Sequence, residues 1–348
     1  MTRSVDRHQS IEALAREWDE LADQLSSPPW SRPEWFSAWW TAFGRGALEV
    51  FSVRENDRLI GVVPVAVERD RLTSPSNWHT PEFGLLGEPT AIAPLAHALF
   101  GDGPERVSLA FVVEGRDVDA VRTAAHDAKY RWLARPLERS PYITIDGDWQ
   151  HYEARRSRKL LGELRRRRRR LNEKGDFSFE CVDGSEDLDG LLDDGFRIEA
   201  AGWKGARGSA ISSKEETDRF YRTVARWAAD RGWLRLAFLR LDGRPFAFDL
   251  CFECDGVHYL MKTGFDPDFG RFAPGMILRH EMLSRAFGLG LHSYEFLGAN
   301  EAWKLDWAEE TRERCLLQAF ARSPRGLLDW AANEYGRRLA RVALRRRA

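Results

Sequence analysis

Cysteine is scarce in this sequence, and so are long apolar runs and any surplus of charge of one sign. The 348 residues include four cysteines, and 53 Lys and Arg residues stand against 54 Asp and Glu. A disulfide framework needs many more cysteines, so we expect a reducing, cytoplasmic location. No window approaches the roughly 20 apolar residues of a membrane span, and the N-terminus lacks the apolar stretch of a signal peptide. A net charge of −1 predicts no general affinity for nucleic acid or membranes.

The sequence contains one C-x-x-C motif, formed by Cys251 and Cys254. Strand positions three apart point to opposite faces, and no second pair of cysteines completes a zinc site. We interpret the thiols as free and buried, and we expect no metal.

The length exceeds what one hydrophobic core usually organises, and 43% hydrophobic residues are typical of a folded globular protein. The patterning predicts an N-terminal domain over 1–147, a basic linker helix over 148–175, a second domain over 176–322 and a basic C-terminal helix over 323–348. Each domain is long enough to bury its own core.

Helical and strand-like patterns alternate in the first half, which favours an α/β or α+β fold. Apolar residues spaced along one helix face predict helices over Ile11–Leu25 and Pro33–Phe43. Strands are predicted at Leu48–Arg54, Leu59–Glu68, Arg106–Val112 and Tyr142–Ile145, with a helix near Asp117–Lys129.

The second half shows the same mixture. Strands are predicted at Phe177–Val182, Leu234–Leu241, Phe246–Cys254, His258–Phe265 and Ser293–Phe296. Helices are predicted at Leu188–Ala201, Glu215–Arg231 and Met276–Phe287, with more helix from Ala302 onward.

Six consecutive arginines, Arg165–Arg170, lie within the helical, charged segment Trp149–Lys174. Successive helical positions point in every direction, so the run cannot form one binding face. We favour a solvated linker helix over the alternative of contact with a polyanion such as tRNA, lipid phosphate or acidic polysaccharide. The basic tail Arg337–Arg347 gives weak support for peripheral contact with anionic lipid.

The segment Asp266–Leu278 runs from a predicted strand into a predicted helix. The unpaired N–H groups and the dipole of a first helical turn hold a pyrophosphate well, and Gly275 lets a phosphate approach the backbone. Arg271 adds a bidentate donor nearby. An ordinary strand-to-helix turn with Pro274 at the helix start explains the segment equally well.

An ordered set of motifs favours the first of these readings. The pattern Arg271-x-x-Pro-Gly-x-x-Leu278, followed by Tyr294–Gly298 and Glu301–Lys304, resembles the C-terminal domain of GNAT proteins of the CelD-like, cellulose-biosynthesis-associated branch. It is also similar to Fem-type peptidoglycan aminoacyl transferases. Two further stretches fit the CelD-like pattern, Glu199–Gly205 and Leu241–Phe248.

The resemblance covers about residues 155–322 and implies an α/β (α+β) fold class. Two GNAT-like domains are expected, each a mixed, mostly antiparallel sheet flanked by helices, with the N-terminal one degenerate. Acetyl-CoA or another acyl-CoA is the implied cosubstrate, where two strands splay apart. The implied donor-binding residues are Lys262 and Thr263 beside the pantetheine, and Arg271, Phe272, Ala273, Pro274, Gly275, Met276, Ile277 and Leu278 at the pyrophosphate. Pro274 departs from the usual loop and removes one N–H donor.

Acylation of an amine needs a neutral nucleophile, a polarised thioester carbonyl and a proton for the leaving thiolate. Glu199 shares a helix face with Trp203 and suits either a catalytic base or a structural carboxylate. Asp249 interrupts an apolar strand, so it either faces the cleft or is paired inside the sheet. Lys304 matches the lysine that Fem-type enzymes place at the reacting centre.

Four more residues are predicted to contact the acceptor, namely Trp203, Lys204, Asp266 and Glu301. Lys262 has the alternative reading of a solvated lysine at a strand edge.

Three functions fit the sequence. The leading one is acyl-CoA-dependent transfer, with N-acetylation favoured, to a small amine, amino sugar, or polysaccharide or cell-envelope precursor. The second uses aminoacyl-tRNA as the donor, as Fem-type relatives do, and the arginine run is its only support. The third is a non-catalytic binding protein that keeps the fold.

Overall fold

A computed structural model describes residues 2–202 and 210–345, with the backbone alone over 335–345. The chain forms two compact units: unit 1 combines Met1–Leu137 with Glu313–Ala348, and unit 2 is Glu138–Arg312. These boundaries differ from the sequence-based segments. Residues 313–322 group with the N-terminal residues, and the expected linker helix lies within unit 2.

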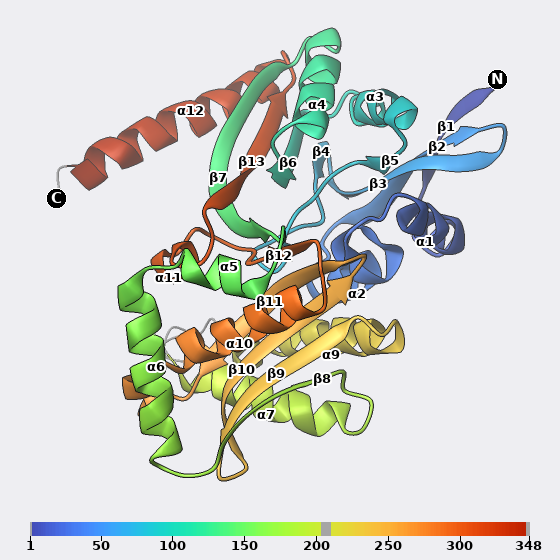
Figure 1. Ribbon diagram of the computed structural model, residues 1–348. Coiled ribbons are helices and arrows are strands. Elements are labelled where there is room, and N and C mark those ends of the chain that lie inside the picture. The colour runs from blue at the N-terminus through green and yellow to red at the C-terminus, as the bar shows by residue number, and fades with distance from the viewer. Residues whose placement is uncertain (1, 203–209, 346–348) are drawn as a thin grey trace. The chain divides into compact units, whose positions relative to one another are not determined.

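Unit 1 is a mixed sheet flanked by helices (Figure 1). Its strands lie in the order β1 (Arg3–His8), β2 (Ala47–Glu55), β3 (Arg58–Glu68), β4 (Arg71–Thr73), β6 (Arg106–Val113) and β13 (Glu310–Phe320), and β5 (Leu86–Gly87) pairs with β3. Its helices are α1 (Ala15–Gln24), the short η1 (Pro29–Ser31), α2 (Pro33–Phe43), α3 (Pro89–Ala98), α4 (Arg116–Asp127) and α12 (Pro324–Arg345). In the described part of the chain, neither α12 nor another helix combines the length and apolar character needed to cross a bilayer.

The parallel strands of unit 1, β4 and β6, remain hydrogen-bonded to each other along the length of β4. Just beyond β4, the Ser74 N–H donates to the carbonyl of Ser108 at 3.1 Å. Farther along, the Phe83 N–H donates to the carbonyl of Phe111 at 3.0 Å. The chain that follows β4 therefore continues to pair along β6.

In unit 2, the end of β7 (Arg131–Thr144) is followed in the sheet order by β12, β11, β10, β9 and β8. These strands are β8 (Phe177–Val182), β9 (Leu234–Leu241), β10 (Arg244–Cys254), β11 (Val257–Phe265) and β12 (Ser293–Glu295). Neighbours are antiparallel except β11 and β12, which are parallel. The expected fold class, mixed sheets flanked by helices, is confirmed.

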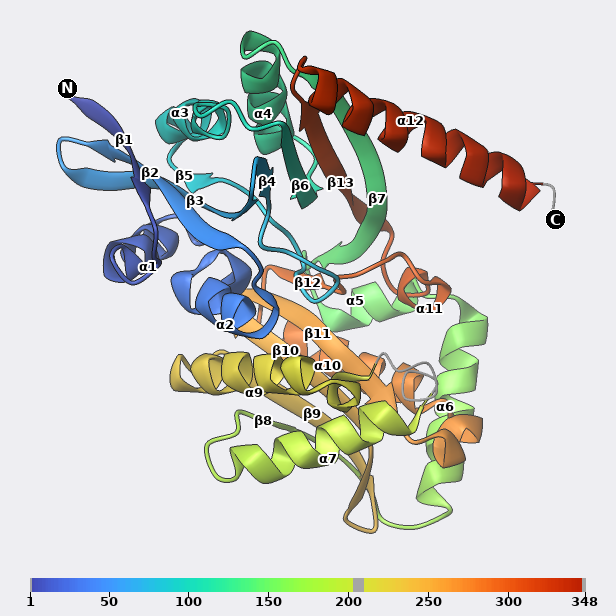
Figure 2. The same ribbon diagram turned by 180° about the vertical axis from the view of Figure 1, so that it is seen from behind.

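Helices cover both faces of the sheet in unit 2. Helix α10 (Pro274–Gly288) lies over one face, and α7 (Leu188–Ala201) and α9 (Glu215–Asp230) lie over the other (Figures 1 and 2). The remaining helices are α5 (Trp149–Ala154), α6 (Arg158–Asn172), α11 (Ala302–Leu305) and the short η2 (Ile211–Ser213) and η3 (Pro267–Phe272). Apolar side chains from α6, α10 and the strands share one core.

The segment expected to be one linker helix is two helices, α5 and α6. Ser157 ends the break between them, because its Oγ accepts the Leu160 N–H at 3.1 Å and caps α6. Leu160, Leu164 and Leu171 then recur on one face of α6 and are buried. Helix α6 therefore packs on unit 2 rather than standing free as a connection.

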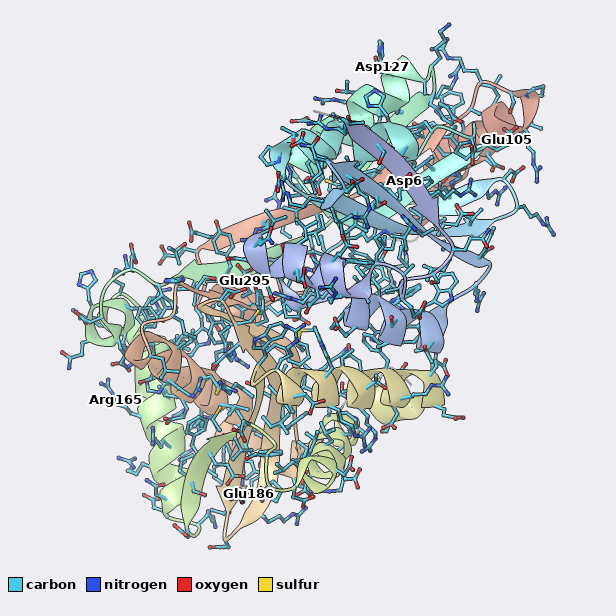
Figure 3. The ribbon with its side chains drawn as sticks, turned by 90° about the vertical axis from the view of Figure 1, so that its right-hand side faces the viewer. Asp6, Glu105, Asp127, Arg165, Glu186 and Glu295 are labelled. Atoms are coloured by element: carbon cyan, nitrogen blue, oxygen red, sulfur yellow. The ribbon has the colours of Figure 1, made fainter. Side chains whose placement is uncertain are left out.

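Two members of the arginine run contact the segment around α10. Arg167 donates to the carbonyl of Arg271, and Arg168 pairs with Glu281 on α10. All members except the half-buried Arg167 are exposed, and Arg165 is labelled in Figure 3.

The sequence predicts more helix from Ala302 onward, but the structure has only a short helix there, followed by a strand. Helix α11 ends at Leu305, and β13 begins at Glu310 and pairs with β6. Buried polar residues within β13, Arg314 and Gln318, hide its strand pattern in the sequence.

Candidate functional site

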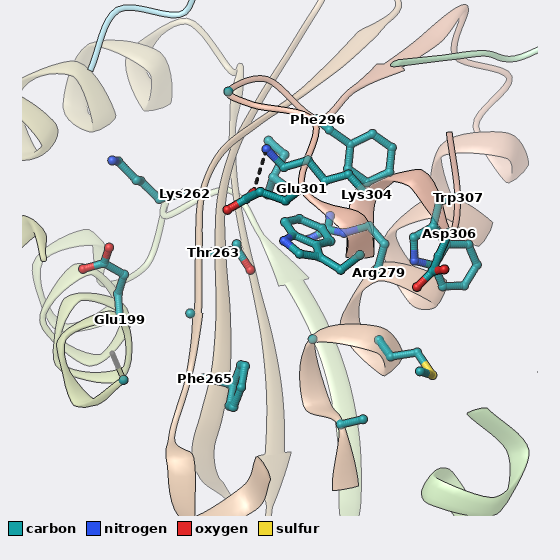
Figure 4. A pocket seen from close by; sticks show the side chains of 18 of the residues that line it. Glu199, Lys262, Thr263, Phe265, Arg279, Phe296, Glu301, Lys304, Asp306 and Trp307 are labelled. Atoms are coloured by element: carbon teal, nitrogen blue, oxygen red, sulfur yellow. Dashed lines mark ion pairs between the residues drawn. The ribbon is translucent and has the colours of Figure 1, made fainter. Parts of the chain in front are cut away.

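Strands β11 and β12 run parallel and then separate. Backbone pairing joins residues 257–259 to residues 293–295 and ends there. From Leu260 to Phe265, β11 pairs with β10 on its other side and lines a cavity of about 820 Å³ (Figure 4). The register between β10 and β11 also shifts, which leaves Met261 as an extra residue in a β-bulge. The open edge of β11 therefore forms one wall of the cavity.

Four other segments complete the cavity walls. The turn into α10 contributes Pro267, Gly270, Ala273, Gly275, Met276 and Arg279. The chain after β12 contributes Phe296, Leu297, Gly298, Glu301, Trp303, Lys304, Asp306 and Trp307. Leu160 of α6, Glu199 of α7 and Gly202 are added from the helices.

The N-terminus of α10 opens into this cavity without a side-chain cap. Ala273 has a left-handed backbone (φ 50°, ψ 57°), and its carbonyl accepts the N–H groups of Met276 and Ile277. Pro274 has no N–H, and the Gly275 N–H has no acceptor among the described residues. A Cβ added at Gly275 would meet only the Phe265 ring, at 3.9 Å. This turn has both the room and the charge preference for an anion.

Eight of the ten predicted donor-binding residues fall into two groups. Thr263, Ala273, Gly275 and Met276 line the cavity. Phe272, Pro274, Ile277 and Leu278 are buried and do not line it, so their side chains serve the core that holds the turn. Arg271 is exposed, and its guanidinium lies 4.8 Å from the centroid of the Phe272 ring.

Glu199 is almost fully buried, at 1% exposure, and lines the cavity from α7. Its Oε2 accepts the Ile211 N–H at 2.9 Å. A Cβ added at Gly264 of β11 would lie 2.6 Å from the Glu199 Cα, so α7 approaches β11 this closely only because position 264 is glycine. The carboxylate is held at the edge of β11 by packing as well as by hydrogen bonding.

Lys262 leaves β11 on the face covered by α9, where its Nζ lies 5.0 Å from the centroid of the Tyr221 ring. Figure 4 shows Lys262 and Glu199 on one side of the strand, with Arg279 on the other. Burial lowers the pKa of Lys262, and the Glu199 carboxylate opposes that shift. Since α10 covers the opposite face, the predicted contact of Lys262 with the donor does not fit this geometry.

Asp249 is fully buried and does not line the cavity, which decides between its two readings in favour of pairing inside the sheet. Its Oδ2 accepts a hydrogen bond from Arg279 Nη2 at 2.7 Å. Arg279 also donates to the Tyr294 hydroxyl and itself lines the cavity. Asp249 thus contacts the cavity only through Arg279, and its predicted catalytic role stays a prediction.

Lys304 is buried in the wall formed by the chain after β12. Its Nζ donates to the carbonyls of Leu297 at 2.6 Å and Ala299 at 2.9 Å, and pairs with Glu301 at 3.1 Å. Leu297 (φ 51°) and Gly298 (φ 60°) have left-handed backbones that turn the chain around the ammonium. Figure 4 shows the pair of Lys304 and Glu301 beside the cavity.

The other predicted acceptor residues are placed differently. Asp266 caps η3, because its Oδ1 accepts the Asp268 N–H at 3.1 Å, and its Oδ2 accepts from Arg244 at 3.1 Å. It does not line the cavity and has a structural role. Trp203 and Lys204 lie outside the described residues.

Sequence reasoning missed Arg279, Trp303 and Trp307. The Arg279 guanidinium lies 5.6–5.8 Å from the ring centroids of Tyr294, Phe296 and Trp303. Arg279, His280 and Glu281 are three consecutive polar residues between Leu278 and Met282, so no sequence signal singles out Arg279.

Residues 156–305, which include most of the cavity wall, match the family model of the acetyltransferase (GNAT) domain. The match covers 150 of the 348 residues and lies within unit 2, and the matched family typically uses acyl-CoA. The GNAT part of the sequence resemblance is confirmed.

Solved structures share this fold over most of their length. FemX has a TM-score of 0.59 and 11% identity, covering 94% of this chain and 99% of its own. The C-terminal domain of a protein assigned as a lysylphosphatidylglycerol synthetase from Agrobacterium fabrum has a TM-score of 0.57 and 15% identity, covering 93% and 96%. At these identities the likeness concerns the fold alone. No curated protein sequence matches the chain.

Proposed function

We propose that the chain is an acyltransferase that moves an acyl group, most simply acetyl, from coenzyme A to an amine in the cavity of unit 2. The observation that carries the proposal is the separation of β11 from β12 beside the uncapped N-terminus of α10. The acceptor class is an amine, an amino sugar, or a precursor of a polysaccharide or the cell envelope, as in the CelD-like branch. The proposed location is the cytoplasm, and unit 1 is proposed to be a degenerate GNAT-like domain.

In the proposal, the acyl-CoA donor binds along two walls of the cavity, the turn into α10 and the edge of β11. The diphosphate of an acyl-CoA would meet the Gly275 N–H and the positive end of the α10 dipole. The backbone of residues 260–265 faces the cavity and offers N–H and C=O groups to the amides of pantetheine. Mostly apolar side chains, among them Met276 and Trp303, surround this path.

In the proposed reaction, the acceptor nitrogen attacks the thioester carbon, an N–C bond forms and the C–S bond breaks. The amine must first lose a proton, and Glu199 is the carboxylate on the acceptor side of β11. A lysine-like amine with a pKa of ~10.4 costs about 4.6 kcal/mol to deprotonate at pH 7. The thiolate leaves with a proton drawn from the acceptor or solvent. The Lys304 ammonium supplies positive potential near the developing oxyanion.

A second candidate donor is aminoacyl-tRNA. It is supported by the exposed arginines of α6, because α6 both lines the cavity through Leu160 and touches the α10 turn through Arg167. Phosphate contacts by such arginines would make binding strongly dependent on salt.

The donor assignment is tested with Gly275→Asp and its neutral partner Gly275→Asn. An acidic residue in the first turn stabilises a helix, so Gly275→Asp should fold, while its charge repels a diphosphate. Acetyl-CoA at 100 times its Kd should stabilise the native protein by about 2.7 kcal/mol. We expect this Tm increase in the wild type, a smaller one in Gly275→Asn and none in Gly275→Asp.

A Tm that acetyl-CoA leaves unchanged in the wild type, together with salt-sensitive binding of aminoacyl-tRNA, would transfer the proposal to the second donor. Equal shifts in all three proteins would remove the α10 turn from donor binding.

A further inference from the structure

Lys262 differs from the other cations that line the cavity in unit 2. Arg279 is paired with Asp249, and Lys304 is paired with Glu301. Across residues 2–202 and 210–345, the Lys262 ammonium has no hydrogen bond and no ion pair; its recorded neighbour is the Tyr221 ring. Within those residues, the cavity therefore holds a positive charge, that of Lys262, without a hydrogen-bonded or ion-paired partner.

Such a charge is unfavourable unless a ligand compensates it. Lys262 is partly buried and lines the cavity, so it loses part of its hydration but remains open to a molecule inside. Burial lowers its pKa, with Glu199 acting in the opposite direction. An ammonium in these surroundings gains most from a charged hydrogen-bond acceptor.

The donor's diphosphate is not that acceptor. Its proposed place is the N-terminus of α10, on the face of the sheet opposite to α7 and α9 (Figures 1 and 2). Lys262 lies with Glu199 on the α7 and α9 side of β11 (Figure 4). The anion that Lys262 meets should therefore belong to the acceptor.

We propose that Lys262 binds a carboxylate of the acceptor, and that the acceptor is an amino acid or a similar small molecule with an amine and a carboxylate. This inference rests on the proposed function. The side of β11 that holds Lys262 and Glu199 offers one cation and one anion, which complement the carboxylate and the amine of a single zwitterion. A phosphate would bring a second negative charge close to Glu199, so a carboxylate is favoured over a phosphate.

The test compares amines that differ only in this carboxylate. Glycine, β-alanine, L-lysine and L-glutamate are each paired with the corresponding carboxamide. Two readouts are taken on the full chain: the Tm with each probe, and release of CoA thiol from acetyl-CoA. The variants are Lys262→Gln, Lys262→Met and, as a control for charge, Lys174→Gln at an exposed position.

We expect at least one carboxylate probe to raise the Tm of the wild type and of Lys174→Gln, and its carboxamide to have no such effect. In Lys262→Gln the kcat/KM for that carboxylate should fall about 10- to 100-fold, the range of a hydrogen bond to a charged group. The rate with the carboxamide should fall much less, because its neutral carbonyl loses only an uncharged acceptor's hydrogen bond. Without a probe, Lys262→Met should melt no lower than the wild type, because an uncompensated charge is removed.

The inference is overturned if no carboxylate probe raises the Tm of the wild type. It is also overturned if the kcat/KM for carboxylates and for carboxamides falls equally in Lys262→Gln. Failure of the proposed function looks different, because acetyl-CoA itself then leaves the Tm unchanged. A phosphorylated amino sugar that binds in a Lys262-dependent manner while all carboxylates fail would also overturn the carboxylate assignment.

Discussion

At the residue scale, Lys304 combines a structural and an electrostatic role. Its ammonium holds two carbonyls of the left-handed turn after β12 and pairs with Glu301 at the cavity. We predict that Lys304→Ala lowers kcat by ~10²–10³, the loss typical of removing one group that stabilises an oxyanion. Steady-state kinetics on the folded variant check this, with Lys174→Ala as the control. Unchanged turnover would remove Lys304 from the mechanism.

Gly264 sets the distance between the Glu199 carboxylate and the edge of β11. We predict that Gly264→Ala destabilises the protein by about 1–3 kcal/mol, because the new methyl group meets the Glu199 backbone and α7 has to move. The kcat/KM should fall by more than the loss in the free energy of unfolding explains. Gly162→Ala in α6, where an added Cβ meets nothing within 4 Å, should leave the free energy of unfolding equal or higher. If both variants behave alike in urea unfolding, the close approach has no consequence.

Single residues of the site were predictable where a chemical motif and a chain turn coincide. Gly275, Glu199 and Lys304 were named from the sequence, and the structure places all three around one cavity. Asp249 and Leu278 were named from the sequence as well, but both are buried and do not line the cavity. Sequence spacing cannot show which side of a strand or helix the cavity takes, because that depends on where β11 and β12 separate.

At the scale of elements, a buried charge cluster joins β10, β11 and α10. Glu253 accepts a hydrogen bond from Arg235 Nε at 2.9 Å, contacts Arg285, and lies 2.9 Å from His258 Nδ1. Burial by itself would raise the pKa of Glu253, but the hydrogen bonds from His258 and Arg285 lower it from 4.5 to about 2. The ionised carboxylate therefore stabilises the packing of these elements.

This cluster predicts a loss of stability in acid. Because the unfolded carboxyl has the higher pKa, its contribution is fully present above pH 4.5 and is lost as the pH falls toward about 2. The lowering of the pKa corresponds to roughly 3 kcal/mol at 1.36 kcal/mol per pKa unit. Glu253→Gln should have a lower free energy of unfolding at neutral pH than the wild type. Between pH 4.5 and about pH 2 it should lose less of that free energy than the wild type does. Urea unfolding at several pH values checks this, and parallel curves for both proteins would contradict it.

Most elements of unit 2 were predictable from periodicity. The predicted bounds agree with β8, α7 and β9, and differ by one or two residues for α10 and β10. Two elements were not. Ser157 interrupts a charged segment whose composition favours continuous helix, and β13 contains Glu, Arg, Leu and Ala, which favour helix until pairing with β6 overrides them.

At the scale of the whole molecule, unit 1 depends on the last part of the chain. Strand β13 pairs with β6 from Arg314 to Phe320, and Leu317 and Phe320 are buried. We predict that a chain ending after Arg312 loses hydrogen-exchange protection in β6 and becomes poorly soluble, because an edge and an apolar face are exposed. A chain ending after Ser323, which keeps β13 and removes α12, should retain that protection.

Equal protection of β6 in the two shortened chains would show that unit 1 closes without β13. The division into two units is itself a property that the sequence hides, since the residues of unit 1 are separated by the whole of unit 2. Composition changes along the chain mark boundaries only where a domain is continuous.

The interleaved order of the two units also bears on synthesis. A nascent chain leaves the ribosome from its N-terminus, so the contiguous residues of unit 2 emerge and begin to fold before translation reaches β13. Until β13 is synthesised, one edge of β6 has no partner strand, although the residues of β6 were translated much earlier. The part of the protein that is translated first is therefore the part that matures last.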